Sequence, residues 1–279
     1  MVGPIEISRG CPWGCKYCQV TYTHGAFMRH RSIENIVYWI NRMIECNAYD
    51  IRFISPNAFS YGGNGIKINH DQLNNLFNML YEYSRRNSDV RIFLGSFPSE
   101  IRPDFITDEL IKQLSKIVSN KRIVIGVQSA SENLLKKMNR GHSVNDVEES
   151  IIILNKYGFR ADLDFIFGLP EETNEDIELT LKFIDKITRK YWVKIHAHTF
   201  IPLPGSPYSR MKPKPLSIKL RRKIYKLIGD IKLYGQWEWQ EEISRKIIKL
   251  KNKKIIFDLK FLTENLKKNG KIFKVKINS

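Results

Sequence analysis

The feature that most constrains this chain is a cysteine-rich stretch near its N-terminus. Cys11, Cys15 and Cys18 place three of the four cysteines within eight residues, and the fourth, Cys46, is distant in sequence. Thiols gathered on a Gly- and Pro-containing loop can converge on one metal centre with little ordering of the chain. The spacing therefore predicts a metal site. Disulfides fit poorly, because neighbours this close cannot all pair.

The number of thiols constrains the kind of metal. A structural zinc takes four ligands, and a fully ligated [4Fe–4S] cluster takes four thiolates. Three thiolates on such a cluster leave one iron open to another molecule. Two alternatives stay open: a zinc loop completed by a distant residue such as His24 or His30, and reduced thiols without a metal. We expect Cys46 to be a buried, apolar-like residue, with a fourth ligand as the alternative.

Charge is spread unevenly along the 279 residues. Residues 1–210 carry 26 Lys and Arg against 23 Asp and Glu, a balance of +3, whereas residues 211–279 carry 20 against 6, a balance of +14. A basic region of this kind favours RNA or an anionic substrate as a partner, and the alternative is a Lys-rich solvated surface. We divide the chain into a core domain, 1–210, and a small basic C-terminal extension, 211–279.

Length and composition fit one folded core with a small appendage. No apolar run approaches the roughly 18 residues that a membrane-spanning helix needs, and the N-terminus lacks a basic-then-apolar signal. Together with oxygen-sensitive thiolate chemistry, these features predict a cytoplasmic protein without membrane contact.

Six strand patterns alternate with helical patterns along the core domain. Strands are expected at 4–8, 50–55, 90–95, 122–127, 160–167 and 192–201. Helices are expected to open at Ser32, Asp71 and Thr173, among others. The alternation predicts a parallel α/β sheet, either doubly wound or an incomplete barrel. Further on, we expect a basic amphipathic helix over 217–234, a helix over 243–250, and strands over 252–259 and 272–277.

The distinctive residues of the core follow the ends of strands, where barrel enzymes place their chemistry. The cysteine loop follows the first strand, Ser55 and Asn57 the second, Ser96 the third, Gln128 the fourth and Gly168 the fifth.

On the sixth strand, His196, His198 and Phe200 share one face. If that face lines the interior of a barrel, the two imidazoles are candidates for substrate contact or proton transfer. If it packs on helices, they are core residues.

The C-x3-C-x2-C spacing, with Tyr17 directly before the last cysteine, resembles the signature of the radical S-adenosylmethionine (SAM) enzymes. The resemblance continues through 128–132, 138–142 and 162–173, and covers about residues 5–207. It implies a (β/α)6 partial TIM barrel whose three cysteines hold a [4Fe–4S] cluster, with SAM on the open iron. It also implies a one-electron reductant of the flavodoxin or ferredoxin type, and cleavage of SAM to a 5′-deoxyadenosyl radical that abstracts hydrogen from a substrate.

The same resemblance implies roles for single residues. Gln128 would contact the SAM ribose, and Arg140 the SAM carboxylate, which suits a guanidinium. Asp164 would bind the ribose or stabilise Arg140, Gly168 would let the backbone pass the adenine, and Tyr17 would offer backbone groups to it. Without the resemblance, Gln128 reads as a strand-end cap, Arg140 as a charge at a helix C-terminus and Asp164 as an ion-pair partner.

Two strand ends depart from the superfamily's common pattern. Many radical SAM enzymes end strand two with a Gly-Gly motif that receives the SAM amine, whereas this chain has Ser55-Pro56-Asn57. Coproporphyrinogen oxidases carry a glutamate after strand three, whereas this chain has Gly95-Ser96. Ser55, Asn57 and Ser96 are therefore the candidate cofactor contacts at these ends.

Within the superfamily, the chain resembles the branch that holds the Elongator catalytic subunit, the tRNA methylthiotransferases and cobalamin-dependent proteins. Its closest resemblance is to archaeal-type cobalamin-dependent radical SAM proteins without their cobalamin domain, so use of cobalamin would require a partner domain. Methyl transfer, sulfur insertion and rearrangement all stay open as the later reaction. The alternatives are a tRNA-modifying methylthiotransferase-like enzyme that binds RNA through its basic region, and a zinc-dependent nucleic-acid-binding module without catalysis.

Overall fold

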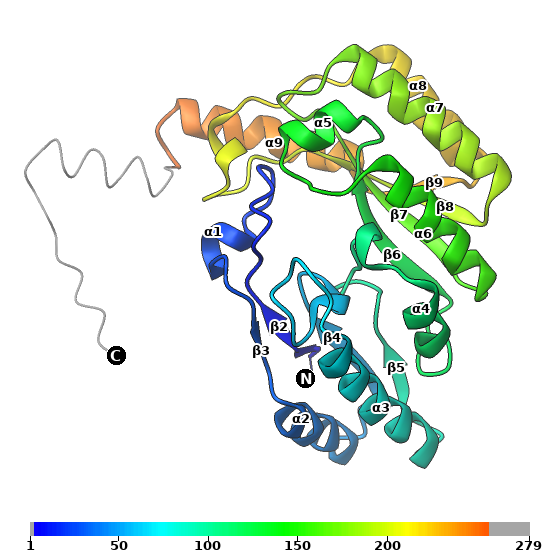
Figure 1. Ribbon diagram of the computed structural model, residues 1–279. Coiled ribbons are helices and arrows are strands. Elements are labelled where there is room, and N and C mark those ends of the chain that lie inside the picture. Colours follow the sequence, from blue (N-terminus) through cyan, green and yellow to red (C-terminus); the bar gives the residue numbers. More distant parts are fainter. Residues whose placement is uncertain (1–2, 257–279) are drawn as a thin grey trace, which may run out of the picture.

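A curved parallel sheet forms the centre of the computed structural model, which describes residues 3–256 (Figure 1). Its strands are β1 (Ile5–Glu6), β4 (Asp50–Ile54), β5 (Arg91–Phe93), β6 (Arg122–Gln128), β7 (Arg160–Phe167), β8 (Val193–Thr199) and β9 (Leu233–Tyr234). They pair in the orders β1-β4-β5 and β6-β7-β8-β9. The Val124 N–H donates to Gly95 O (2.8 Å), which joins the two halves, and in residues 3–256 no pairing joins β1 to β9. The result is an open, partial barrel.

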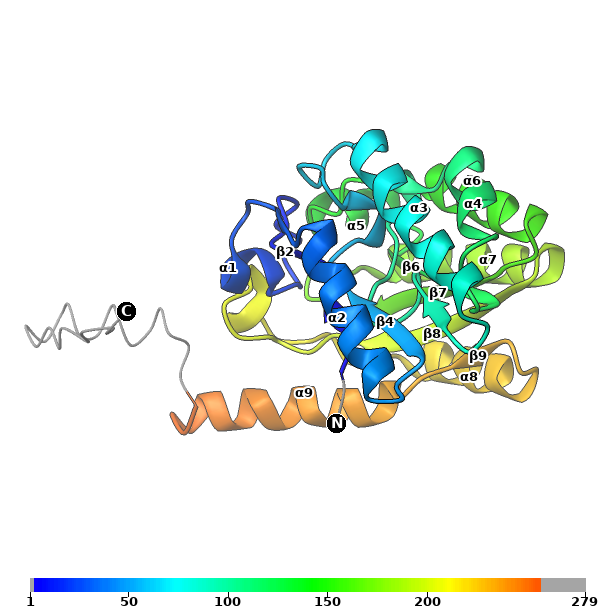
Figure 2. The ribbon, with the colours of Figure 1, turned by 90° about the horizontal axis from the view of Figure 1, so that it is seen from below.

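Helices accompany this sheet, and most of them cover its outer face (Figures 1 and 2). They are α1 (Val20–His24), α2 (Ile33–Glu45), α3 (His70–Arg86), α4 (Asp108–Leu114), α5 (Glu132–Lys137), α6 (Val144–Lys156), α7 (Asn174–Lys190), α8 (Ile218–Gly229) and α9 (Trp237–Asn252). Local sequence explains where several of them begin. The side chains of Ser32, Ser143 and Thr173 accept hydrogen bonds from backbone N–H groups of the first turn, as N-caps do. In the described residues, no helix is both long and apolar enough to cross a bilayer.

Alternation along the strands separates the two faces of the sheet. On β6, Ile123, Ile125 and Val127 are fully buried in the core between sheet and helices, whereas Val124 and Gly126 face the concave interior. On β7 the interior face carries Arg160 and Asp164. The polar residues of these strands therefore face the interior of the barrel, because the period of two sends the aliphatic core set outward.

The predicted six-strand α/β core is confirmed, with local corrections. The first strand splits in two, and its second part, β2 (Ser8–Arg9), pairs antiparallel with β3 (Arg29–His30). The third helix opens at His70 because Asn69, and not Asp71, accepts the capping bond from Gln72. Helix α8 stops at Gly229, short of residue 234, since Ile231 adopts a left-handed φ of 59° and the chain then enters β9.

Cys46 is a further correction, because its side chain is exposed. It follows the last turn of α2, and the apolar face of that helix buries Ile36, Ile40 and Met43 instead. Cys46 also lies outside the residues that line the cysteine cavity described below.

The described part of the basic region, residues 211–256, packs against the barrel. Strand β9 extends the sheet beside β8, and Thr199 Oγ1 donates to the backbone oxygen of buried Trp237 (2.8 Å). Helix α9 then runs toward the α1 side of the molecule (Figure 2). Asn252 ends α9 where a strand was expected, whereas the strand expected at 272–277 lies outside the described residues. The division of the chain at residue 210 stays a prediction.

Candidate active site

The cysteine loop is held at both ends. Strands β2 and β3 close it as an antiparallel pair, and the Cys11 N–H donates to Gly25 O (3.1 Å). Thr21 Oγ1 donates to Cys11 O (2.7 Å), which ties α1 to the start of the loop. Gly10 at φ 94° is required here, since a Cβ at this position would lie 2.2 Å from Phe27 O. The loop therefore presents its thiols from a fixed backbone.

The three thiols line one cavity of about 370 Å³ at the carboxyl ends of the strands. Cys15 is buried, and Cys11 and Cys18 are partly buried. Burial raises the pKa of the Cys11 and Cys18 thiols, and the adjacent Cys15 adds to the effect. A bound metal overcomes such a shift because coordination deprotonates a thiol outright.

The spacing of the sulfurs bears on which metal fits. Among the described residues, the sulfurs of Cys11, Cys15 and Cys18 do not all lie within 4.8 Å of one another. Sulfurs on a tetrahedral zinc, with Zn–S bonds of about 2.3 Å, would be only about 3.8 Å apart. The thiols are therefore not gathered as closely as a single zinc ion would hold them.

Most of the predicted cofactor residues meet in this cavity. Eight line it, from five separate parts of the chain: Cys11, Cys15, Tyr17, Cys18, Ser55, Gln128, Arg140 and Asp164. Local spacing brings together only those of the cysteine loop. Ser55 arrives from the end of β4, Gln128 from β6, Arg140 from the loop after α5 and Asp164 from β7.

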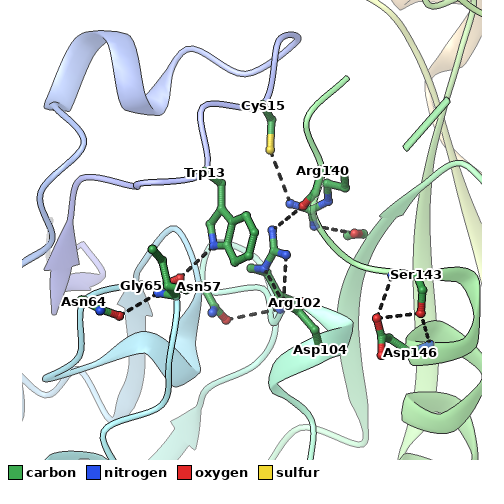
Figure 3. Close-up of polar contacts among 12 residues, drawn as sticks. Trp13, Cys15, Asn57, Asn64, Gly65, Arg102, Asp104, Arg140, Ser143 and Asp146 are labelled. Carbon is green, nitrogen blue, oxygen red and sulfur yellow. Dashed lines mark hydrogen bonds and ion pairs between the residues drawn. The ribbon is translucent and has the colours of Figure 1, made fainter. Parts of the chain in front are cut away.

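Arg140 is buried and reaches the cysteine loop (Figure 3). Its Nη1 lies 3.9 Å from Cys15 Sγ, and its Nη2 donates to Gly126 O (2.5 Å). Its Nε is buried without a hydrogen-bond partner in the described protein. Buried donors are normally paired, so this unpaired N–H fits an acceptor of a bound molecule, such as a carboxylate.

Gln128 ends β6 in a conformation that non-glycine residues rarely adopt. Its φ is 73°, and the pairing of β6 with β7 is irregular between Gly126 and Gln128. Such strain persists only where the surrounding structure holds it, and it concentrates at functional sites. The irregularity turns the end of β6 so that Gln128 lines the cavity.

Three predicted residues lie outside the lining of the cysteine cavity. Asn57 is buried, and its Oδ1 accepts a hydrogen bond from the backbone N–H of Arg102 (3.2 Å). Ser96 lines a second, larger cavity. Gly168 has φ 75°, and its backbone bonds to Glu172 Oε2 (2.7 Å) and to the Lys214 N–H (2.9 Å). Its conformation joins β7 to the segment before α8.

The sequence reasoning did not single out Arg102, which lines the same cavity. Its guanidinium carbon lies 3.7 Å from the ring centroid of Trp13, and its Nη1 donates to Arg140 O (3.0 Å). Asp104 pairs with it at 2.9 Å. Figure 3 shows Trp13 between Gly65 and this arginine. Arg102 follows the third strand, just as the predicted site residues follow other strands. That position was the only feature of the sequence that could have indicated it.

A second cavity of about 740 Å³ occupies the barrel interior. It shares two lining residues, Glu100 and Asp164, with the cysteine cavity, so the two spaces adjoin. His196 and His198 line it, whereas Phe200 is buried in a separate cluster with Leu169 and Tyr208. Both imidazoles therefore face the interior and are accessible to a substrate there.

The hydrogen bonds around the two histidines assign their protons. The Thr199 N–H donates to Gln240 Oε1 (2.8 Å), so the amide nitrogen of Gln240 faces His198 Nδ1 (3.1 Å) and donates to it. The His198 proton is then on Nε2, which lies 3.7 Å from Asp164 Oδ1. His196 Nδ1 lies 2.9 Å from the same oxygen and donates to it. In the neutral imidazole, His196 Nε2 then carries the lone pair.

The same bonds bear on metal binding. Ligand atoms of Asp164, His196 and His198 lie within 4.8 Å of one another, the distance at which three groups can share an ion. A ligating imidazole normally donates its other N–H to an acceptor, but Gln240 offers His198 a donor. Asp164, His196 and His198 are therefore better suited to form a hydrogen-bonded group than to bind a metal ion.

Burial and charge set the ionisation of the carboxyls between the two cavities. Burial tends to raise the pKa of Asp164, but the hydrogen bond from His196 and the nearby His198 outweigh it and lower the pKa. Burial raises the pKa of Glu100, and the nearby charge of Asp164 adds to that. Asp164 is thus the anion and hydrogen-bond acceptor of this junction.

A partial barrel with a thiol-lined pocket at the carboxyl ends of its strands defines a metal-dependent enzyme core. Residues 5–184 match the family model of the Radical SAM superfamily, and the chain belongs to that superfamily. A [4Fe–4S] cluster and SAM are therefore its cofactors, and an electron donor must reduce the cluster. The predicted superfamily and fold are confirmed.

Known relatives of this chain include tRNA-modifying enzymes. It is 26% identical over 258 residues to the threonylcarbamoyladenosine tRNA methylthiotransferase MtaB of Thermotoga maritima, covering 84% of this chain and 55% of the relative. It is 29% identical over 298 residues to the tRNA-2-methylthio-N(6)-dimethylallyladenosine synthase of Petrotoga mobilis, covering 98% and 63%. The chain spans about half the length of the curated relatives it matches.

Among solved structures, the radical SAM methyltransferase TsrM of Kitasatospora setae superposes with a TM-score of 0.59. The match covers 75% of this chain and 38% of TsrM at 15% identity. At that identity the likeness shows the shared fold alone.

Proposed function

We propose that this chain is a radical SAM enzyme that abstracts a hydrogen atom from a substrate held in the barrel interior. The observation that carries the proposal is the cysteine cavity, where three thiols lie with Gln128, Arg140 and Asp164 and which adjoins the interior cavity. When reduced, the bound cluster supplies an electron that cleaves SAM to methionine and a 5′-deoxyadenosyl radical.

Each residue of the cavity has a role in this proposal. Cys11, Cys15 and Cys18 hold the cluster. Arg140 binds the SAM carboxylate through its buried, unpaired Nε–H, and Gln128 binds the ribose from the strained end of β6. Asp164 accepts a hydrogen bond from a ribose hydroxyl at the junction of the two cavities. Tyr17 and Ser55 complete the walls.

Two buried arginines support the charge balance of the site. Arg140 and Arg102 lie beside the cysteine loop with side chains almost fully buried, and Trp13 covers Arg102. In a site of low dielectric, their charges offset those of the thiolates and of a bound carboxylate. The indole and the loop also keep bulk water away from the arginines.

The test is anaerobic reconstitution of the full chain with iron and sulfide, followed by reduction with dithionite in the presence of SAM. Mass spectrometry should detect 5′-deoxyadenosine from the wild type and none from the Cys11→Ala/Cys15→Ala/Cys18→Ala triple variant. Cys46→Ala is the matched control and should resemble the wild type, because Cys46 is exposed and outside the cavity. A colourless zinc-loaded protein, or a brown protein that makes no deoxyadenosine, would contradict the proposal.

The physiological reductant is proposed to be a flavodoxin or ferredoxin type of protein, and a cytoplasmic location stays a prediction. Substituting purified flavodoxin and its reductase for dithionite checks the donor. Deoxyadenosine should form at a rate that depends on flavodoxin concentration. A preparation that is active with dithionite but makes no deoxyadenosine with flavodoxin would oppose this choice.

A second candidate is modification of tRNA, favoured by the names of the curated relatives and by the balance of +14 over residues 211–279. Exposed cations on α8 and α9, among them Arg222, Lys226 and Lys249, would contact phosphates. Filter binding of tRNA should then weaken steeply with salt, by a log–log slope near the number of phosphates contacted. Binding that is weak and insensitive to salt would exclude this candidate.

A further inference from the structure

The interior cavity has the size and lining of a small-molecule site. Its volume of about 740 Å³ lies within the roughly 300–1,000 Å³ of ligand pockets. Its acidic residues, Glu100 and Asp164, lie where it adjoins the cysteine cavity. Its basic residues come from strands at the other end, where β6 and β7 begin at Arg122 and Arg160. The cavity is thus polarised along the barrel.

Two arginines of this cavity, Arg52 and Arg122, each lie near an aspartate that already forms an ion pair with another arginine. Arg91 holds Asp50 at 2.6 Å, and Arg52 is 3.9 Å from that aspartate. Arg160 likewise holds Asp162 through bonds of 2.6 and 3.0 Å.

Arg122 lies 3.7 Å from Asp162, which is too far for a hydrogen bond. Arg52 and Arg122 therefore retain N–H donors suited to an added oxyanion, such as a carboxylate or a phosphate.

Aromatic rings line the cavity beside both of its ends, because Phe93 is level with Arg52 and Tyr234 is level with His196. The Arg52 guanidinium lies 3.9 Å from the ring centroid of Phe93. Tyr234 stacks on His196, with centroids 4.4 Å apart and planes inclined by 4°. Trp192 also lines the cavity, and its side chain is 54% exposed. Phe93, Trp192 and Tyr234 together give the cavity an aromatic lining that suits a planar, apolar substrate body.

His196 forms the inner end of this path. Asp164 and Tyr234 fix its ring, and its Nε2 accepts a hydrogen bond. The register of β6 with β7 and β8 puts His196 and Asp164 level with Gly126, four residues beyond Arg122. At about 3.3 Å per residue, the two ends are about 13 Å apart along the strand, before side chains shorten the gap.

We infer that the barrel interior binds a small, elongated molecule with an oxyanion at one end and a hydroxyl or N–H at the other. Arg52 and Arg122 bind the oxyanion, the aromatic faces hold a planar body, and His196 Nε2 accepts the hydrogen bond beside the SAM pocket. The inference names the substrate class of the proposed function and rests on it. RNA is the competing occupant, and the test includes it.

The probe is 6-hydroxy-2-naphthoate, a fluorescent planar molecule with a carboxylate and a hydroxyl at opposite ends. Equilibrium dialysis against reconstituted full-length protein should show saturable binding at one site. Arg122→Gln should weaken it about tenfold, as expected for loss of one charge-assisted pair. Lys219→Gln, which removes an exposed cation from α8, is the matched control and should leave binding unchanged. If Arg122→Gln does not fold, Arg122→Lys tests the same contact with an intermediate loss.

Related probes test each end of the site. 2-Naphthol lacks the oxyanion and should bind about tenfold more weakly. 2-Naphthoate lacks the hydroxyl and should bind more weakly than the probe. This difference in affinity should disappear in His196→Phe, which keeps a ring against Tyr234 but lacks Nε2. 2-Naphthyl phosphate shows which oxyanion the arginines prefer.

Absence of saturable binding, an equal loss in Lys219→Gln, or a hydroxyl preference that survives His196→Phe would overturn the inference. Displacement of the probe by an anticodon stem-loop RNA would overturn it in favour of RNA. None of these measurements needs turnover. Probe binding without deoxyadenosine in the parallel assay would mean failure of the proposed function alone, and deoxyadenosine without probe binding would mean failure of this inference alone.

Discussion

Arg140 lies with Nη1 3.9 Å from the sulfur of Cys15, a residue 125 positions earlier in the chain. This contact joins the loop after α5 to the cysteine loop, so the proposed SAM carboxylate site and the proposed cluster site share one wall.

Arg140→Lys should lower SAM affinity by about 10–100-fold while iron content stays near that of the wild type. A lysine has no fork with which to bond Gly126 O and still offer an N–H to a carboxylate. Equilibrium dialysis with SAM and iron analysis of the same sample measure both quantities. Arg86→Lys, on an exposed turn of α3, is the control. Unchanged SAM affinity in Arg140→Lys would remove Arg140 from the binding site.

Gly141→Ala should lower both stability and iron loading, because the new Cβ would lie 2.2 Å from the ring of Trp13. Displacing Trp13 disturbs its bond to Gly65 O (2.8 Å) and its contact with Arg102. Gly158→Ala is a close control, since Gly158 has the same φ of 75° but nothing within 4 Å.

Both alanines carry the backbone cost of about 1–3 kcal/mol, measured by urea denaturation. Only Gly141→Ala should lose more unfolding free energy than this backbone cost and fail to take up iron. Equal losses in the two variants would show that Trp13 moves aside freely.

Gln128→Gly should separate the strain of this position from its proposed binding role. Glycine adopts φ 73° without steric cost, so the free energy of unfolding should stay constant or rise by about 1 kcal/mol. SAM affinity should fall, because the amide that lines the cavity is gone. Thermal denaturation and SAM dialysis give the two readings. Wild-type SAM affinity in this variant would assign Gln128 to the backbone turn alone.

Glu172 should make stability depend on pH. Burial raises its pKa to about 7, although the Gly168 N–H bond opposes the shift. The folded protein therefore binds this proton more tightly than the unfolded chain, whose glutamate titrates near its ordinary value of about 4.3. This contribution to stability is full below that value and is lost as pH rises through about 7.

Glu172→Gln keeps an oxygen that can accept the Gly168 N–H but does not titrate. Between about pH 5 and pH 8, the wild type should lose about 2–3 kcal/mol more unfolding free energy than the variant. Urea denaturation at both values measures the difference. Parallel losses in the two proteins would show that Glu172 titrates normally.

Much of this protein could be predicted because the signals are local. The α/β alternation and the caps at Ser32 and Thr173 depend on residues within a few positions of one another. The helix limits that were predicted wrongly, at Asp71 and residue 234, depended on which cap and which strand partner prevailed. A single sequence carries little information about either choice, since tertiary pairing overrides propensity.

The sequence by itself determined the chemistry of the cysteine loop, because three thiols within eight residues can meet without help from the rest of the chain. Only the tertiary structure decided which remote groups complete the site. It brought Arg102 against Trp13, and it brought Gln240, from the basic region, to His198 inside the barrel. These contacts depend on how a curved sheet brings its strand ends together and on where α9 packs, and that geometry is set by the whole core at once.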